Sequence, residues 1–376
     1  MKKNFKKIMV GNLLFFPMTW AMAAVWHPLN INQELPPNTI VEATAEQELQ
    51  PQKIISRQEI KANDFIQNNR TQEQINKEVV PSKISSSISL GMITGGQAKE
   101  SVYIPELGDN LSVLNWDIKN NPTIKAEFTW NIFPWLAFNI NGWTTFNSNR
   151  STMNDYDWLD FDDRSNTTDW SHHGNTRLNS ANHVDLNMTA WVLEKPQYKV
   201  GVMAGYQEEH FSWSAKGGEA QYSIQDEQGN YIPGTSQTFI GKFNDDLTVG
   251  GYKQKFKTPY IGLVGQYQHG NFVLNTNFKY SQWSKASTQD QHYLRELTGH
   301  GNASGGNYFS ANINAGYYII PFTKIFTEVN WTQYKRNLGQ TSRTQNGTTT
   351  YIDQNIVQEG IANHYVGINA GLQYEF

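Results

Sequence analysis

The sequence predicts an all-β fold: a ten-stranded antiparallel transmembrane β-barrel with long extracellular loops and short periplasmic turns. Three observations lead to this prediction. Apolar and polar residues alternate along ten segments, short and long connections alternate between those segments, and aromatic residues make up 13% of the chain. Only every second side chain of such a strand faces lipid, so the fold needs no long apolar run.

The alternation is clearest at the C-terminus. Every second residue from Val366 to Phe376 is apolar or alanine, and the residues between them are small or polar. The same period of two runs through 184–190 and 272–280. This period gives a strand one apolar face and one polar face. The predicted strands are 84–97, 110–133, 136–147, 180–194, 198–216, 248–268, 271–285, 306–320, 323–336 and 361–376.

The connections between the predicted strands alternate in length. Short ones lie at 133–135, 195–197, 269–270 and 321–323, and long polar ones at 148–179, 217–247 and 286–305. Closure into a barrel removes sheet edges that lipid cannot satisfy. A β-sandwich is the alternative, but it would not keep the long loops at one end. Several strands exceed the ~9–11 residues that a bilayer requires, so we expect a rigid rim above the lipid.

The first residues have the pattern of a secretory signal peptide. Lys2 and Lys3 precede an apolar stretch at 8–18 and the small-residue site Ala21-Met22-Ala23. A transmembrane anchor is the alternative, but it needs ~20 apolar residues. We therefore predict a signal peptide at 1–23 and the barrel at 84–376.

Residues 24–83 differ in composition from the rest of the chain. They are rich in Gln, Asn, Glu and Pro, and they contain few aromatic residues. We predict a disordered periplasmic N-terminal extension. The alternative is a helix within 56–80, where a thin apolar stripe occurs.

Composition also limits the classes of partner. A formal net charge of −4 gives no reason to expect a nucleic-acid partner. The chain has no cysteine, so it forms no disulfide and must take its stability from the fold itself.

Two pairs of polar residues at the tops of predicted strands are candidates for chemistry. Asp155 and Asp157 are two residues apart, as are Asp290 and His292. Side chains at this spacing point to the same side of an extended strand. Crowded carboxylates can share a proton, and a carboxylate orients an imidazole. If the two pairs faced each other they would bracket a water molecule, but either could instead be a solvated turn.

Other clusters give weaker signals. The acidic run at 160–163 lacks the glycine and the final glutamate of an EF-hand calcium loop. His172 and His173 would point apart on a strand, which makes them a poor zinc pair. No G-x-S-x-G motif occurs in the chain. We expect no metal and no cofactor.

Several segments resemble the omptins, outer-membrane endopeptidases of Gram-negative bacteria, in the same order along the chain. They are NDYDW from Asn154, NTRLNSAN, MAGYQE, GYKQKFKTPYIGL, FKYSQW and NAGYY. The resemblance runs from about Ser85 to Phe376. It implies a ten-stranded barrel in the outer membrane that faces the cell exterior with its active site and cleaves peptides, often between two basic residues.

The resemblance also implies roles for individual residues. The catalytic acids of the family fall on Asp155 and Asp157, and its Asp-His pair falls on Asp290 and His292. Through this likeness, His292 is expected to activate the water molecule and Asp290 to orient His292.

The substrate-binding acids of the family match this sequence incompletely. Two acids surround the basic residue before the cut; one falls on Glu100, and the other falls on Thr288, which is not acidic. This departure predicts a looser preference for arginine. Asp169 matches an acid near the residue after the cut. A carboxylate suits a guanidinium because paired hydrogen bonds form between them.

Omptins need lipopolysaccharide, and the resemblance implies that Tyr206, Glu208, His210 and Lys255 contact it. Two of these positions carry arginine in the family. Lysine lacks the bidentate geometry of arginine, and histidine gains a positive charge only in acid. The sequence therefore predicts weaker or more pH-dependent lipopolysaccharide binding.

Other functions are weighed against proteolysis. A non-enzymatic adhesin or receptor would also use long surface loops. A lipid-modifying barrel enzyme would need a Ser/His site that faces lipid, and we find no such site in the sequence. A pore is disfavoured because side chains fill a narrow barrel.

Overall fold

The computed structural model describes residues 83–161, 163–223 and 239–376. The predicted signal peptide at 1–23 and all but the last residue of the predicted extension at 24–83 lie outside these ranges. Within the described ranges, no helix has the length and apolar character needed to cross a membrane.

The described residues form one antiparallel sheet, and one short 3-10 turn lies at Tyr293–Arg295. The strands are β1 (Ile84–Ile104), β2 (Asp109–Ile118), β3 (Asn121–Phe133), β4 (Leu136–Thr145), β5 (Arg150–Asp157), β6 (Asp169–Glu194), β7 (Tyr198–Tyr222), β8 (Phe239–His269), β9 (Phe272–His292), β10 (Leu297–Ile320), β11 (Thr323–Gln345), β12 (Thr348–Tyr351) and β13 (Gln358–Glu375).

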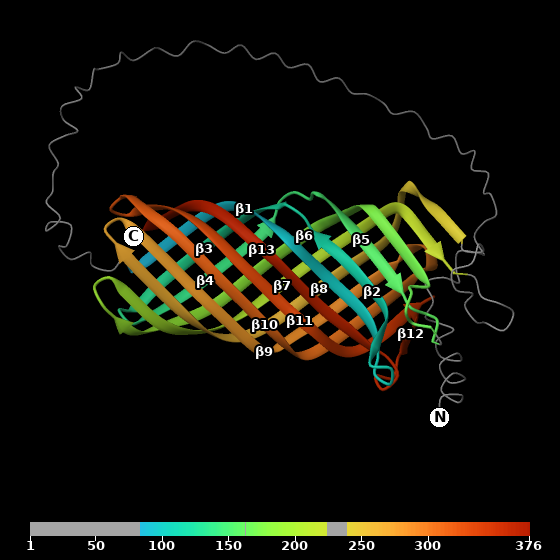
Figure 1. Cartoon of the computed structure of the whole chain (residues 1–376). Coiled ribbons are helices and arrows are strands. Elements are labelled where there is room, and N and C mark those ends of the chain that lie inside the picture. The colour runs from blue at the N-terminus through green and yellow to red at the C-terminus, as the bar shows by residue number, and fades with distance from the viewer. Residues whose placement is uncertain (1–82, 162, 224–238) are drawn as a thin grey trace, which may run out of the picture. The chain divides into compact units, whose positions relative to one another are not determined.

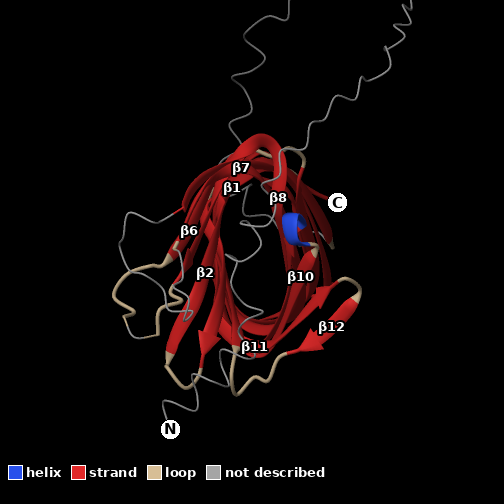
Figure 2. Cartoon of the chain, turned by 90° about the vertical axis from the view of Figure 1, so that its right-hand side faces the viewer, coloured by secondary structure: helices blue, strands red, loops and turns tan. Residues whose placement is uncertain are grey.

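The sheet closes into a barrel because β13 pairs with both β1 and β11 (Figures 1 and 2). At the short-turn end the path from β1 to β6 runs through β3 and β4, and at the opposite end it runs through β2 and β5. Ten strands therefore surround the axis at either level, as predicted. The segment predicted as one strand at 110–133 breaks at Asn120, whose φ is 50°, a left-handed conformation that asparagine tolerates.

The outside of the barrel carries an apolar band. Its members alternate with inward-facing polar residues, as the period of two predicted. Tyrosine, tryptophan and phenylalanine are common near the short-turn end of the band. The exposed apolar side chains of the band include Leu90, Phe128, Trp130, Phe133, Trp135, Leu186, Val202, Leu263, Phe272, Ile325, Leu372 and Phe376.

The strands continue far beyond this band. β6 has 26 residues and β8 has 31, whereas ~9–11 span a bilayer. Much of the sequence predicted as loop at 148–179 and 286–305 is strand in the structure. Outward residues above the lipid face water, so these strand ends lack the apolar alternation that marks the lower strands. The predicted rim is present and is taller than expected.

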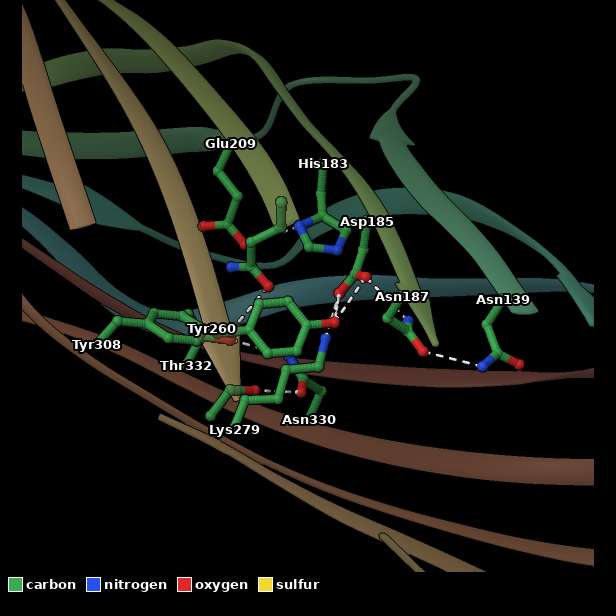
Figure 3. Close-up of polar contacts among 12 residues, drawn as sticks. Asn139, His183, Asp185, Asn187, Glu209, Tyr260, Lys279, Tyr308, Asn330 and Thr332 are labelled. Carbon is green, nitrogen blue, oxygen red and sulfur yellow. Dashed lines mark hydrogen bonds and ion pairs between the residues drawn. The ribbon is translucent and has the colours of Figure 1, made fainter. Parts of the chain in front are cut away.

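Polar side chains meet inside the barrel (Figure 3). Asp185 is buried, forms an ion pair with Lys279, and accepts hydrogen bonds from Tyr260 at 2.7 and 2.8 Å. Glu209 is paired with the Nδ1 atom of His183 at 2.9 Å. Buried charges are costly unless they are paired, so these pairs offset the cost of burying Asp185 and Glu209, although one oxygen of Glu209 has no hydrogen-bond partner among the described residues.

A layer of packed aromatic side chains lies above the polar interior. Trp116 stacks on Tyr252 with ring centroids 5.5 Å apart, and Trp213 and Phe211 continue the layer. Along β2, Trp116 follows the rim residue Ser112 on the same face. The layer therefore separates the rim from the polar interior and forms the floor of whatever site the rim holds.

Candidate active site

Asp155 and Asp157 lie on β5, which exists only in the rim. β5 pairs with β2 on one side and β6 on the other. Both side chains point into the barrel, because residues two apart share a face, and both are nearly inaccessible to solvent. The hydroxyl of Ser112 on β2 donates a hydrogen bond of 3.3 Å to Asp155.

Asp290 and His292 lie at the rim end of β9. The Nε2 atom of His292 is 2.6 Å from a carboxylate oxygen of Asp290. Asp290 is buried between Tyr252 on β8 and Gly299 on β10, whereas His292 keeps about a fifth of its side chain accessible. The aspartate thus fixes the ring, and the ring borders the opening of the barrel.

The two pairs interact across the mouth of the barrel. Burial is the largest cause that raises the pKa values of Asp155 and Asp157; the charge of Asp290 adds to the shift of Asp155, and the charge of His292 partly offsets that of Asp157. β5 and β9 are not neighbours in the sheet, so these effects arise across the mouth of the barrel and not along a strand. The structure therefore brings together the four side chains that the sequence proposed as one site.

Burial and like charge perturb the titration of the β5 aspartates. Burial is the largest cause that raises the pKa of Asp155 well above its usual value, and the charges of Asp157 and Asp290 add to it. Burial raises the pKa of Asp157 to about 6, although Ser112 and Arg295 oppose the shift. Near neutral pH the pair can therefore hold a proton between its two carboxyls.

A second acidic cluster adjoins these residues. Glu100 on β1 is buried, as is Thr288, which lies two residues before Asp290 on the same face of β9. The hydroxyl of Thr288 donates a hydrogen bond to Glu359 on β13. The sequence analysis missed Glu359, which lies at the start of the last strand, outside the predicted 361–376 segment.

Asp169 lies at the start of β6, paired in register with Asp157. It is fully buried and accepts a hydrogen bond of 2.8 Å from the backbone N–H of Ser223. Burial raises the pKa of Asp169 to about 8, and the charge of Asp157 contributes. This carboxyl borders the catalytic candidates on the side opposite to the Glu100 cluster.

The remaining predicted residues lie on the outer face of β7 and β8. Glu208 is central: it accepts a hydrogen bond of 2.7 Å from Tyr206 and pairs with Lys255 at 3.0 Å. His210 lies 3.6 Å from Glu208, and Lys257, which the sequence analysis missed, lies 3.9 Å away. The structure thus brings the four predicted residues into one exposed cluster at the upper edge of the apolar band.

Comparison with known proteins shows the family. The model described as Omptin family matches residues 80–376. The chain belongs to the omptin family. This omptin is 39% identical over 324 residues to outer membrane protease OmpP of Escherichia coli K12. The aligned region covers 86% of this chain and 96% of the relative. It is 37% identical over 308 residues to the plasminogen activator of Yersinia pestis, with 82% and 94% covered.

A solved structure agrees with this assignment. The crystal structure of outer membrane protease OmpT from Escherichia coli matches with a TM-score of 0.71 and 38% identity, over 79% of this chain and 98% of that one. These comparisons therefore confirm four predictions from the sequence: the resemblance to the omptin family, the all-β barrel, the peptide-hydrolase class and the outer-membrane location.

Proposed function

We propose that this omptin cleaves peptides and proteins at basic sites by direct attack of a water molecule held between the Asp155/Asp157 pair and the Asp290/His292 pair. The observation that supports this most strongly is the electrostatic contact of the two pairs across the cleft. A water molecule between them would meet a base on one side and proton-bearing carboxyls on the other.

The chemistry follows from these positions. One nitrogen of His292 is held by Asp290, so its other nitrogen takes a proton from the water as the water oxygen attacks the scissile carbonyl carbon. Asp155 and Asp157, which share a proton, orient the water and donate a hydrogen bond to the developing oxyanion. His292 then gives its proton to the leaving nitrogen as the C–N bond breaks, which regenerates both pairs.

A preference for basic residues is supported by the buried acids beside the cleft. Glu100 lies on one side and Asp169 on the other. Each is more than nine-tenths buried, and a guanidinium or an ammonium group of the substrate would compensate such a charge.

The experiment is cleavage of a quenched peptide that contains Arg-Arg, first by whole cells and then by purified protein. We expect His292→Ala and Asp155→Asn to lower kcat by at least about 100-fold, since general acid–base groups typically contribute that much. Glu219→Gln, an exposed rim carboxylate on β7, is the matched control and should retain activity. An adhesin predicts no cleavage by any form, and full activity of His292→Ala contradicts the mechanism.

We also propose that lipopolysaccharide activates this omptin through the exposed cluster on β7 and β8. Lys255 and Lys257 lie on β8 beside Glu208, and lysine ammonium groups suit lipid phosphates as point charges. Activity of the detergent-purified protein with and without defined lipopolysaccharide, from pH 5 to pH 8, tests this. Loss of stimulation in Lys255→Gln/Lys257→Gln is expected; stimulation that is equal in variant and wild type contradicts it, and a flat pH profile counts against a role of His210.

A further inference from the structure

Glu359 extends into the rim from β13, over two neighbouring strands. Its carboxylate lies against the backbone of Gly301 on β10, where a Cβ atom would overlap it. Thr288 on β9 and Thr341 on β11 are the register partners of Gly301 on either side; the hydroxyl of Thr288 donates a hydrogen bond to Glu359, and Thr341 lies near enough to favour its charged form. The hydroxyl of Thr288 and the absence of a side chain at Gly301 therefore hold this carboxylate in place.

The carboxylate of Glu359 meets that of Glu100 from the other side. The two groups are close enough to hydrogen-bond to each other and to repel each other when both are charged. Both side chains are more than nine-tenths buried. Among the described residues, neither takes part in an ion pair with a lysine, an arginine or a histidine.

The carboxylates of Glu100 and Glu359 therefore form a site that a positively charged group would stabilise. One carboxylate oxygen of Glu100 is buried and has no hydrogen-bond partner among the residues the structure describes. Burial of carboxylates without a counter-charge is costly, and the cost is offset when a charged donor enters. The unpartnered oxygen indicates that the counter-charge comes from a ligand.

The pair also lies where a substrate side chain would reach it. Thr288 is two residues before Asp290 on the same face of β9, and the charge of Asp290 acts on both Glu100 and Glu359. A side chain that leaves the scissile bond toward β1 and β13 would therefore end between the two glutamates.

We infer that Glu359 is a specificity-determining residue: with Glu100 it forms a two-carboxylate pocket that binds the guanidinium or ammonium group of the substrate residue before the cut. This inference rests on the proposed function. It replaces the expectation that Thr288 leaves the pocket with a single acid, because Thr288 here positions an acid supplied by β13.

The test uses three peptides that differ only in the residue before the cut: arginine, lysine or citrulline, a neutral arginine analogue. Glu359→Gln should lower the ratio of kcat/KM for arginine over citrulline by about 10- to 100-fold, the worth of a hydrogen bond to a charged group. Citrulline cleavage should be nearly unchanged, and Glu219→Gln should leave the ratio unaltered. An unaltered ratio in Glu359→Gln overturns the inference.

A second variant separates charge from shape. In Glu359→Ala/Thr288→Asp the carboxylate is moved from β13 to β9, and we expect it to regain most of the arginine preference that Glu359→Ala loses. Equal loss on all three peptides, without this rescue, would make Glu359 structural and overturn the inference. Failure of the proposed function gives a different result. In that case His292→Ala still cleaves the peptides, whatever the effect of Glu359→Gln on arginine preference.

Discussion

At the scale of single residues, the rim contains several buried acidic side chains whose negative charges repel one another. Glu100, Glu359, Asp155 and Asp157 all have raised pKa values, with burial as the largest cause in each case. Such crowding costs folding free energy, and it persists where binding or catalysis needs it. Replacement of one acid by its amide should therefore stabilise the protein while it damages function.

Glu359→Gln is expected to stabilise the barrel at alkaline pH. Burial raises the pKa of Glu359 from 4.5 to about 7, so the folded state disfavours the charged form. The cost is absent below pH 4.5, grows as pH rises, and is complete above about pH 7. We expect a gain on the order of 3 kcal/mol at pH 8 and almost none at pH 4, measured by urea unfolding in micelles. A gain that is equal at both pH values contradicts this account.

The same titration should appear in substrate binding. Glu359 is faced by Glu100 from β1, Asp290 from β9 and Tyr252 from β8. Protonation removes the charge that attracts a cation, so KM for an arginine peptide should rise as pH falls from 8 to 6, while KM for the citrulline peptide stays flat. The difference between the two profiles should disappear in Glu359→Gln, and its persistence there would assign the titration to another group.

The residue scale also shows what the sequence could predict. Spacing gave candidate pairs at Asp155/Asp157 and Asp290/His292, because residues two apart share a face of a strand whatever the rest of the fold. It could not show that the pairs meet, and it missed Glu359, because contacts across a barrel depend on register and tilt. Thr288 was judged by its own lack of charge, whereas in the fold its hydroxyl serves an acid 71 residues later.

At the scale of elements, strand boundaries were predicted well where lipid dictates the pattern and less well above it. The end of β3, the starts of β4 and β9 and the end of β13 follow alternation that the bilayer enforces. The upper parts of β6, β7 and β10 have polar residues on both faces, so they lack that signal. The split between β2 and β3 at Asn120 was hidden because the alternation continues across it.

β10 carries a glycine on which the rim depends. In Gly301→Ala the new methyl group would overlap the carboxylate of Glu359, so this side chain must leave its seat. We expect arginine preference to fall about as far as in Glu359→Gln, roughly 10-fold or more. Gly367→Ala on β13, whose nearest neighbour would be 3.9 Å away, is the control and should keep its preference. Equal preference in both variants would place Glu359 elsewhere.

At the scale of the whole molecule, the barrel is held by its outer apolar band and its inner polar network. Lys279 should matter to this stability because it is paired with Asp185, which is buried deep in the lumen. Lys279→Met would leave that carboxylate without its cation, at a cost of roughly 3–5 kcal/mol.

Urea unfolding from micelles measures this cost. The double variant Lys279→Met/Asp185→Asn should recover much of the loss, because no unpaired charge remains. A single variant as stable as wild type would show that the neutral donors Tyr260 and Asn187 satisfy Asp185 without a cation.

The aromatic layer of Trp116, Tyr252 and Trp213 affects how substrates reach the site and how products leave it. We expect these packed side chains to close the lumen of the described barrel beneath the rim, so that peptides do not pass from one side of the bilayer to the other. Substrates and products would then enter and leave through the same opening, at the rim of the barrel. A substrate chain therefore need not enter by one of its ends. We expect an exposed loop of a folded protein to enter the rim, to be cleaved there and to leave, without a break in the membrane barrier.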